Sequence, residues 1–351
     1  MPLRAYLRPP VRELPFPLEE PGCRHFLRPR QALWQGARAL GLEPGDEILM
    51  PAYNHGSELQ ALLDNGLEPR FYEGTPALEP SEDELESCTG ARTRALYLIH
   101  HIGFPQDAPR WRRWCDERGL LLIEDLALGW LAERDGLPAG SLGDLSIFGY
   151  YTMLGIPEGA AVLRRGGPSA ATAPEPAEFG WRAVARRQAG RIVLRAPGSA
   201  ALRQRVMPEP VYDASADMQL GDRASGPTKA SLFLLRRLRP GRVAGRRREN
   251  YRTLLGGLRE LVPAPFQELP PGASPLIFPI RCERKLEVLE RLGAKGIRPL
   301  DIWSATHPRV PAARFPGATA RRETVVGLPV HQELRPRDLE RMIAAVAEVG
   351  G

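Results

Sequence analysis

Residues 108–126, APRWRRWCDERGLLLIEDL, contain a helix followed directly by a buried strand. Gly119 ends the predicted helix, and the strand is expected over Leu120–Glu124. The strand is apolar without alternation, which is typical of parallel strands buried on both faces. Ligands of open parallel sheets bind beyond the carboxyl ends of the strands, so Asp125, directly after this strand, is expected at a functional edge.

The same unit recurs upstream. Residues 29–51, PRQALWQGARALGLEPGDEILMP, predict a short helix, a turn and a strand around Glu47–Met50. Residues 57–74 repeat the pattern, with a helix that ends at Gly66 and a strand near Arg70–Glu73. Residues 94–103, RALYLIHHIG, form another apolar run. These alternating segments predict an α/β fold with a mostly parallel sheet flanked by helices.

The pattern changes near residue 240. ASPLIFPIRC and ETVVGLPV read as strands, ERKLEVLERLGAKGI as a helix between them, and RPRDLERMIAAVAEV as a final amphipathic helix. We therefore predict a large domain over residues 1–235 and a small α+β domain over residues 236–351. A Gly-, Pro- and Ala-rich linker or insertion is expected at about 164–215.

Composition excludes several classes of protein. The chain has 351 residues, 43% of them apolar and 26% charged, as in ordinary globular proteins. No apolar run is long enough for a membrane span, and residues 1–22 lack a secretory signal, so a cytoplasmic protein is expected. The four cysteines are far apart, which predicts neither a metal site nor disulfides. The net charge of +6 is spread along the chain, and no nucleic-acid partner is expected.

Three stretches together resemble a known family. Residues 41–74, 99–130 and 140–151 are similar to the large domain of the DegT/DnrJ/EryC1/StrS sugar aminotransferases. The similarity covers most of residues 30–165 and continues more weakly in residues 221–238 and in the C-terminal domain. The resemblance implies the fold-type I aminotransferase architecture, a pyridoxal phosphate (PLP) cofactor, a homodimer and a place in sugar or secondary-metabolite biosynthesis.

Only part of the family's cofactor site is present. Asp125 matches the aspartate that pairs with the pyridine nitrogen. Leu126, Ala127 and Leu128 follow it where the family has a glutamine, and Gly149 replaces a serine. Pro29, which has no N–H to donate, lies where a Gly-Thr turn binds the phosphate.

The Schiff-base lysine is also absent from its expected place. That position falls within residues 151–154, YTML, and the only lysines of the sequence are Lys229, Lys285 and Lys295. Lys229 lies in a segment that resembles the family's interface helix. It could therefore approach the cofactor of a neighbouring subunit.

The candidate site residues follow from this comparison. The candidate acid–base groups are Asp125, His55, His100, Tyr150 and Tyr151. His100 and His331 have the alternative role of supporting the fold. The candidate ligand-binding residues are Arg28, Arg30, Tyr53, Asn54, Trp130 and Thr152.

Three hypotheses remain open at this point. In the first, the chain is not a transaminase and uses no cofactor. Its pocket serves PLP-independent chemistry or binds a ligand such as a nucleotide sugar, or the chain is a partner subunit of an active homologue. In the second, a sugar aminotransferase or dehydratase binds PLP or pyridoxamine phosphate (PMP) non-covalently. In the third, Leu126, Leu128 and Trp130 pack the pocket closed.

Overall fold

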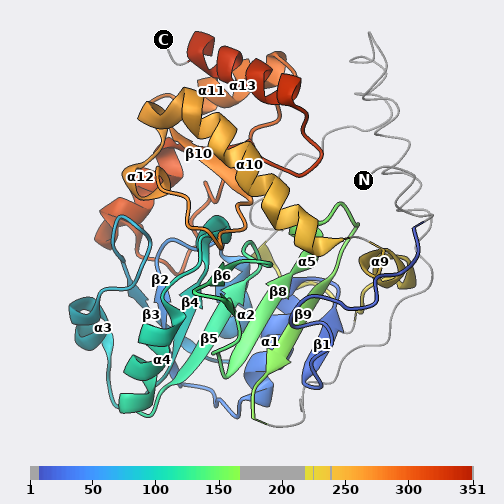
Figure 1. Cartoon of the computed structure of the whole chain (residues 1–351). Helices are drawn as coiled ribbons and strands as arrows, with labels where there is room; N and C mark the ends of the chain where they lie inside the picture. The colour runs from blue at the N-terminus through green and yellow to red at the C-terminus, as the bar shows by residue number, and fades with distance from the viewer. Residues whose placement is uncertain (1–7, 167–217, 224, 238, 350–351) are drawn as a thin grey trace.

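A seven-stranded sheet forms the centre of the computed structural model (Figure 1), which describes residues 8–166, 218–223, 225–237 and 239–349. The strand order is β1-β9-β8-β5-β4-β2-β3. Strand β9 is antiparallel to both of its neighbours, and the other pairs are parallel. The predicted mostly parallel α/β fold is therefore confirmed.

The strands of this sheet are β1 (Cys23–Phe26), β2 (Glu47–Pro51), β3 (Glu68–Tyr72), β4 (Thr93–Ile99), β5 (Leu121–Leu126), β8 (Leu145–Gly149) and β9 (Ala160–Arg164). The helices between them are α1 (Pro29–Ala39), α2 (Ser57–Leu63), α3 (Glu82–Cys88), α4 (Ala108–Glu117) and α5 (Tyr150–Met153). A small hairpin consists of β6 (Glu133–Arg134) and β7 (Leu137–Pro138).

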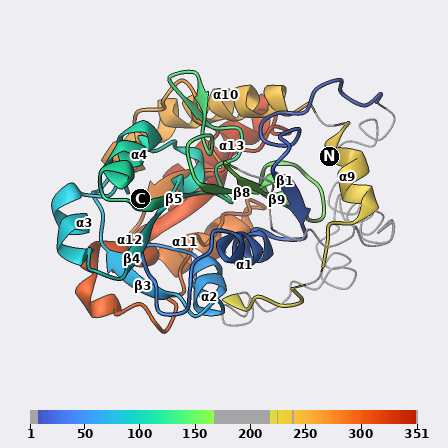
Figure 2. The same cartoon turned by 90° about the horizontal axis from the view of Figure 1, so that it is seen from below.

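The central strands are apolar because helices cover both faces of the sheet. On one face, Ile48 and Met50 of β2 pack in the same cluster as α1 and α2. On the other face, Leu49 packs with Trp111 and Trp114 of α4. Figure 2 shows α4 and the pair α1 and α2 on opposite sides of the strands. Alternate residues of one strand therefore enter two separate cores, which explains the absence of a polar face.

The C-terminal part lies beyond one end of this sheet (Figure 1). It follows α9 (Lys229–Leu235) and contains α10 (Pro240–Leu258), β10 (Ile277–Arg281), α11 (Lys285–Ala294), α12 (Pro316–Thr324), β11 (Val325–Pro329) and α13 (Pro336–Val349). Strands β10 and β11 pair in antiparallel orientation. The domain boundary at residue 236 stays a prediction, and residues 167–215 of the predicted linker lie outside the described residues.

The C-terminal part is attached at the carboxyl ends of the parallel strands. The backbone N–H of Leu276 donates to Ile102 O just after β4, and Arg247 of α10 donates to Met153 O of α5. Ser274 N donates to Gly103 O, and a Cβ on Gly103 would lie 1.9 Å from Ser274 O. Glycine is required at this position because the two backbones touch and because its φ is +89°. These contacts place the C-terminal part next to the edge where Asp125 lies.

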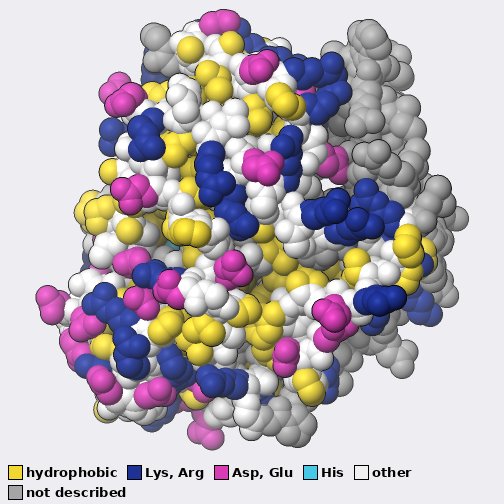
Figure 3. Space-filling view, in the orientation of Figure 1, with side chains coloured by type: hydrophobic (Ala, Val, Ile, Leu, Met, Phe, Trp, Pro, Cys, Tyr) yellow, Lys and Arg dark blue, Asp and Glu magenta, His cyan; other side chains and the backbone are white. Residues whose placement is uncertain are grey.

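On the face shown in Figure 3, arginine and lysine side chains lie among acidic ones. This agrees with the dispersed charge expected from the sequence. None of the helices within the described ranges has the length and apolarity needed to cross a bilayer.

Candidate cofactor and substrate cavity

A cavity of about 510 Å³ lies at the carboxyl edge of the sheet. This volume is in the range of small-molecule sites. Its walls come from the starts of α1 and α2, the ends of β4 and β5, helix α5, residues 219–222 and Trp303. Of the candidate residues, those that line it are Arg28, Arg30, His55, Asp125, Tyr151 and Thr152. An open cavity contradicts the hypothesis of a closed pocket. Leu128 lines the cavity, whereas Leu126 and Trp130 pack in a separate apolar cluster.

Asp125 is a buried carboxyl group in this wall. The Tyr97 hydroxyl donates to its Oδ2 at 2.6 Å, and the Ala127 N–H donates to its Oδ1 at 2.7 Å. Burial, and secondly the negative charge of Glu58, raise the pKa of Asp125 to about 6. Within the described part of the chain, no arginine or lysine forms an ion pair with it. The carboxylate is therefore held in place without a cationic partner.

Glu58, in the first turn of α2, adds a second carboxyl group to the lining. Its Oε1 accepts the His55 N–H at 2.8 Å, and the Ser57 hydroxyl lies 3.0 Å from Nδ1 of His55. Gly56 makes the bend before the helix at a φ of +102°. Sequence analysis missed Glu58, although a glutamate in the first turn of the helix that follows a buried strand was a usable signal.

Arg28 and Arg30, at the start of α1, contribute positive charge to the same cavity. The Arg28 guanidinium lies 4.6 Å from the centroid of the Tyr151 ring, and Arg30 donates to Gln219 O at 2.8 Å. Pro29, the first residue of the helix, has no N–H, so this helix start lacks one backbone donor. The lining therefore combines carboxylates from β5 and α2 with guanidiniums from α1.

Tyr151 and Thr152 of α5 lie in the cavity wall in the segment where the lysine was expected. The Thr152 hydroxyl lies 2.9 Å from Ala127 O and 2.6 Å from Gly149 O, so two carbonyls hold it. All three lysines are described, and none lines the cavity. Lys229 is exposed, and Lys285 and Lys295 pair with Asp301 and Glu348, respectively.

His100 and Tyr150 lie outside the cavity lining. Nδ1 of His100 accepts the Gln106 N–H at 3.1 Å, so Nε2 carries the proton that is donated to Glu124 at 3.0 Å. The Tyr150 hydroxyl lies 3.1 Å from Nδ1 of His25, and burial raises the pKa of Tyr150 well above its usual value. The contacts of both side chains support neighbouring segments.

The remaining candidates also lie behind the wall. Asn54 is fully buried and donates to Pro51 O at 2.9 Å. The Tyr53 ring packs 5.0 Å from the Trp303 ring, and Trp130 donates to Phe16 O at 2.9 Å. Trp303, which sequence analysis missed, comes from a segment far away along the chain. Within the described ranges, no group of three His, Cys, Asp or Glu side chains could hold a metal ion.

The relatives of this chain include sugar aminotransferases. The chain is 27% identical to a dTDP-3-amino-3,4,6-trideoxy-alpha-D-glucose transaminase of Streptomyces venezuelae over 336 residues, 90% of this chain and 80% of the relative. It is 30% identical to a dTDP-4-dehydro-2,3,6-trideoxy-D-glucose 4-aminotransferase of Saccharopolyspora spinosa over 123 residues, 35% of this chain. That second match spans about a third of the relative, 32% of its length.

A solved structure shows the same fold. The DesV protein of S. venezuelae superposes with a TM-score of 0.68 at 24% identity, and the match covers 93% of this chain and 84% of that chain. At this identity the likeness concerns the fold alone.

These findings contradict the first hypothesis, in which the chain is not a transaminase and its chemistry is PLP-independent. A relative that aligns along nearly the whole chain is a transaminase. The hypothesis assumed that a site without lysine has lost its cofactor. The structure instead keeps an open cavity and a buried Asp125 carboxyl group, and neither depends on a covalent anchor.

The family can now be stated. A model of the DegT/DnrJ/EryC1/StrS aminotransferase family matches residues 30–347, which is nearly the whole chain. The matched region includes Arg30, His55, Asp125 and Tyr151 of the cavity, together with the C-terminal part that supplies Trp303. The chain belongs to the DegT/DnrJ/EryC1/StrS aminotransferase family.

Proposed function

We propose that this protein is a sugar aminotransferase that binds PLP or PMP in the cavity around Asp125 without a covalent bond. The observation that carries the proposal is the Asp125 carboxyl group, which is buried in the cavity wall without a cationic partner among the described residues. The molecule that accepts the amino group from this enzyme is a nucleotide sugar, by analogy with the transaminase of S. venezuelae.

The donor set around Asp125 fits a pyridinium ring. Two donors, the Tyr97 hydroxyl and the Ala127 N–H, fix the carboxylate. Burial raises its pKa to about 6, and a cation placed beside it would reverse that effect. A protonated ring nitrogen is such a cation, and Asp125 would keep the proton on it.

Arg28 and Arg30 fit the phosphate group. Guanidinium groups bind phosphate through pairs of N–H donors, and both side chains line the cavity at the start of α1. This arrangement replaces a backbone cradle by side chains. It therefore predicts a phosphate affinity that depends on salt and on these two charges.

Proton transfer in the cavity requires groups other than lysine. When bound, the cofactor supplies an electron sink and carries the amino group. The His55 imidazole and the Tyr151 phenol line the cavity, and both are side chains that exchange protons in enzymes. We propose that one of them moves the proton that the family's lysine would move.

Binding of PMP and PLP to the purified protein tests the proposal. We expect saturable binding of both by calorimetry and absorbance, and a loss of about tenfold or more in PMP affinity for Asp125→Asn. Glu82→Gln is the matched control, because Glu82 pairs with Arg110 at the surface. Borohydride reduction after PLP addition is expected to leave the cavity peptides unmodified.

Two results would decide against the proposal. If neither compound binds, the cavity is not a cofactor site. A stoichiometric PLP adduct on Lys229 would show a covalent link and refute non-covalent binding.

A further inference from the structure

Trp303 is the one residue of the C-terminal part among the described residues that line the cavity. Its φ is +49°, in the left-handed region that bulky residues rarely adopt. Such a conformation persists only where surrounding contacts impose it, and it is commonest at binding sites. The contacts that hold Trp303 therefore bear directly on the shape of the cavity.

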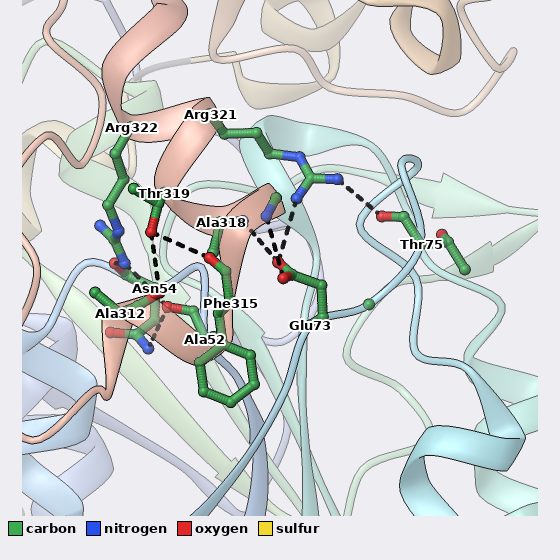
Figure 4. A network of polar contacts seen from close by, with 12 residues as sticks. Ala52, Asn54, Glu73, Thr75, Ala312, Phe315, Ala318, Thr319, Arg321 and Arg322 are labelled. Carbon is green, nitrogen blue, oxygen red and sulfur yellow. Dashed lines mark hydrogen bonds and ion pairs between the residues drawn. The ribbon is translucent and has the colours of Figure 1, made fainter.

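Arg322 of α12 holds the backbone of Trp303, whose ring packs against Tyr53 and His101. Its Nη1 donates to Trp303 O at 2.5 Å and to Ala305 O at 2.9 Å. Its Nη2 donates to Ala52 O at 3.0 Å and to Asn54 O at 2.9 Å. Figure 4 shows this side chain reaching from α12 to the segment of Ala52 and Asn54. One guanidinium thus joins the segment of Trp303 to the segment that leads into His55.

The two joined segments form adjoining parts of the cavity wall. His55 and Trp303 both line the cavity, and the Tyr53 ring behind them lies 5.0 Å from the Trp303 ring. The Arg322 guanidinium lies 5.2 Å from the centroid of that same tyrosine. Movement of Arg322 would therefore release both segments.

The geometry requires arginine. Arg322 is 4% exposed and, within the described residues, forms no ion pair with a carboxylate. Four carbonyl oxygens in two segments compensate the buried charge. Only a planar fork of N–H donors reaches all four, whereas a lysine ammonium is a single point with three donors.

We propose that Arg322 is a positioning residue: it fixes the strained Trp303 and the His55 segment as one rigid wall of the cavity. The C-terminal part thus shapes the binding site through Arg322 as well as through Trp303 itself. The inference rests on the proposed function only for the choice of PMP as the probe.

Arg321 provides a matched control. It lies beside Arg322 on α12, but it donates to Thr75 O at 3.1 Å and lies near Glu73, away from the cavity lining (Figure 4). Arg321→Lys therefore perturbs the same helix and removes the same type of side chain without touching the wall.

The first experiment is hydrogen exchange on the ligand-free full-length chain. In Arg322→Lys we expect residues 51–58 and 301–307 to exchange faster by about tenfold or more, with no such change in Arg321→Lys. Unchanged exchange in both segments would overturn the inference. This measurement does not depend on PMP binding.

The second experiment is PMP titration of the folded variants. Arg322→Lys is expected to weaken PMP binding by about tenfold, and Arg321→Lys by less than about twofold. Leu339→Ala, which removes a buried side chain of α13, controls for a general loss of stability. If Arg322→Lys lowers only the melting temperature and binds PMP like the wild type, Arg322 is merely structural.

Two outcomes are kept separate by this design. If the wild type does not bind PMP, the proposed function fails and the exchange data alone decide about Arg322. If Arg322→Lys does not fold, Arg322→Gln replaces it with the same expected results, because it leaves no charge in the buried site.

Discussion

Replacing Asp125 by asparagine should stabilise the ligand-free protein near neutral pH. Burial and the charge of Glu58 raise the pKa of Asp125 from 3.8 to about 6. The proton therefore binds more tightly in the folded state, so the ionised carboxylate destabilises the fold. The difference between these pKa values corresponds to about 3 kcal/mol. Asparagine has one acceptor oxygen in place of two, which costs about 1 kcal/mol, so a net gain of about 2 kcal/mol is expected above pH 6.

The pH dependence of the stability difference between Asp125→Asn and the wild type tests separately whether the ionised carboxylate destabilises the fold. Below pH 3.8 Asp125 is protonated in both the folded and the unfolded state, and its contribution to the pH dependence of stability vanishes. As the pH rises from 3.8 to about 6, the wild type loses stability through this group, and above 6 the loss is constant. The advantage of Asp125→Asn should therefore grow over this interval and then stay level.

Thermal and urea unfolding of both proteins at a series of pH values would measure this difference. The same variant should bind PMP poorly, so stability and binding move in opposite directions. A variant that is less stable than the wild type at pH 7, or a difference that does not change between pH 4 and 6, would refute the reasoning.

The other predictions concern the cavity, one turn and the assembly. Glu58→Gln should lower the pKa of Asp125 below about 6, since the charge of Glu58 helps to raise it; the pH midpoint of the stability difference would report this shift. Arg28→Met should weaken PMP binding by about tenfold but leave pyridoxamine, which has no phosphate, unaffected in titrations. Gly149→Ala should lower the melting temperature in calorimetry, because its Cβ would lie 2.3 Å from Ala127 O. Light scattering should find a homodimer, as the family resemblance implies, and a mass of 38.8 kDa would contradict it.

Local sequence patterns predicted the central sheet well. The predicted strand at Leu120–Glu124 is β5, Leu121–Leu126, and the predicted strand at Glu47–Met50 is β2, Glu47–Pro51. These strands are buried on both faces, so they appear in the sequence as unbroken apolar runs between glycine-terminated helices. The pairing of β9 with β1 and β8 was not predicted, because antiparallel partners at an edge leave no comparable local signal.

For the candidate site, the sequence by itself determined the strand ends and hence Asp125, and it excluded a lysine before residue 229. Asp125 was predictable because the carboxyl end of a parallel strand lies at the ligand-binding edge, although the structure places it inside β5 and not directly after it. Only the tertiary structure decided which side chains share the cavity. His55 and Glu58 come from the start of α2, whereas Trp303 comes from a distant segment and reaches the wall because Arg322 holds its backbone at a positive φ. The same guanidinium also donates to Asn54 O, 268 positions away along the chain, and no local pattern encodes such a contact.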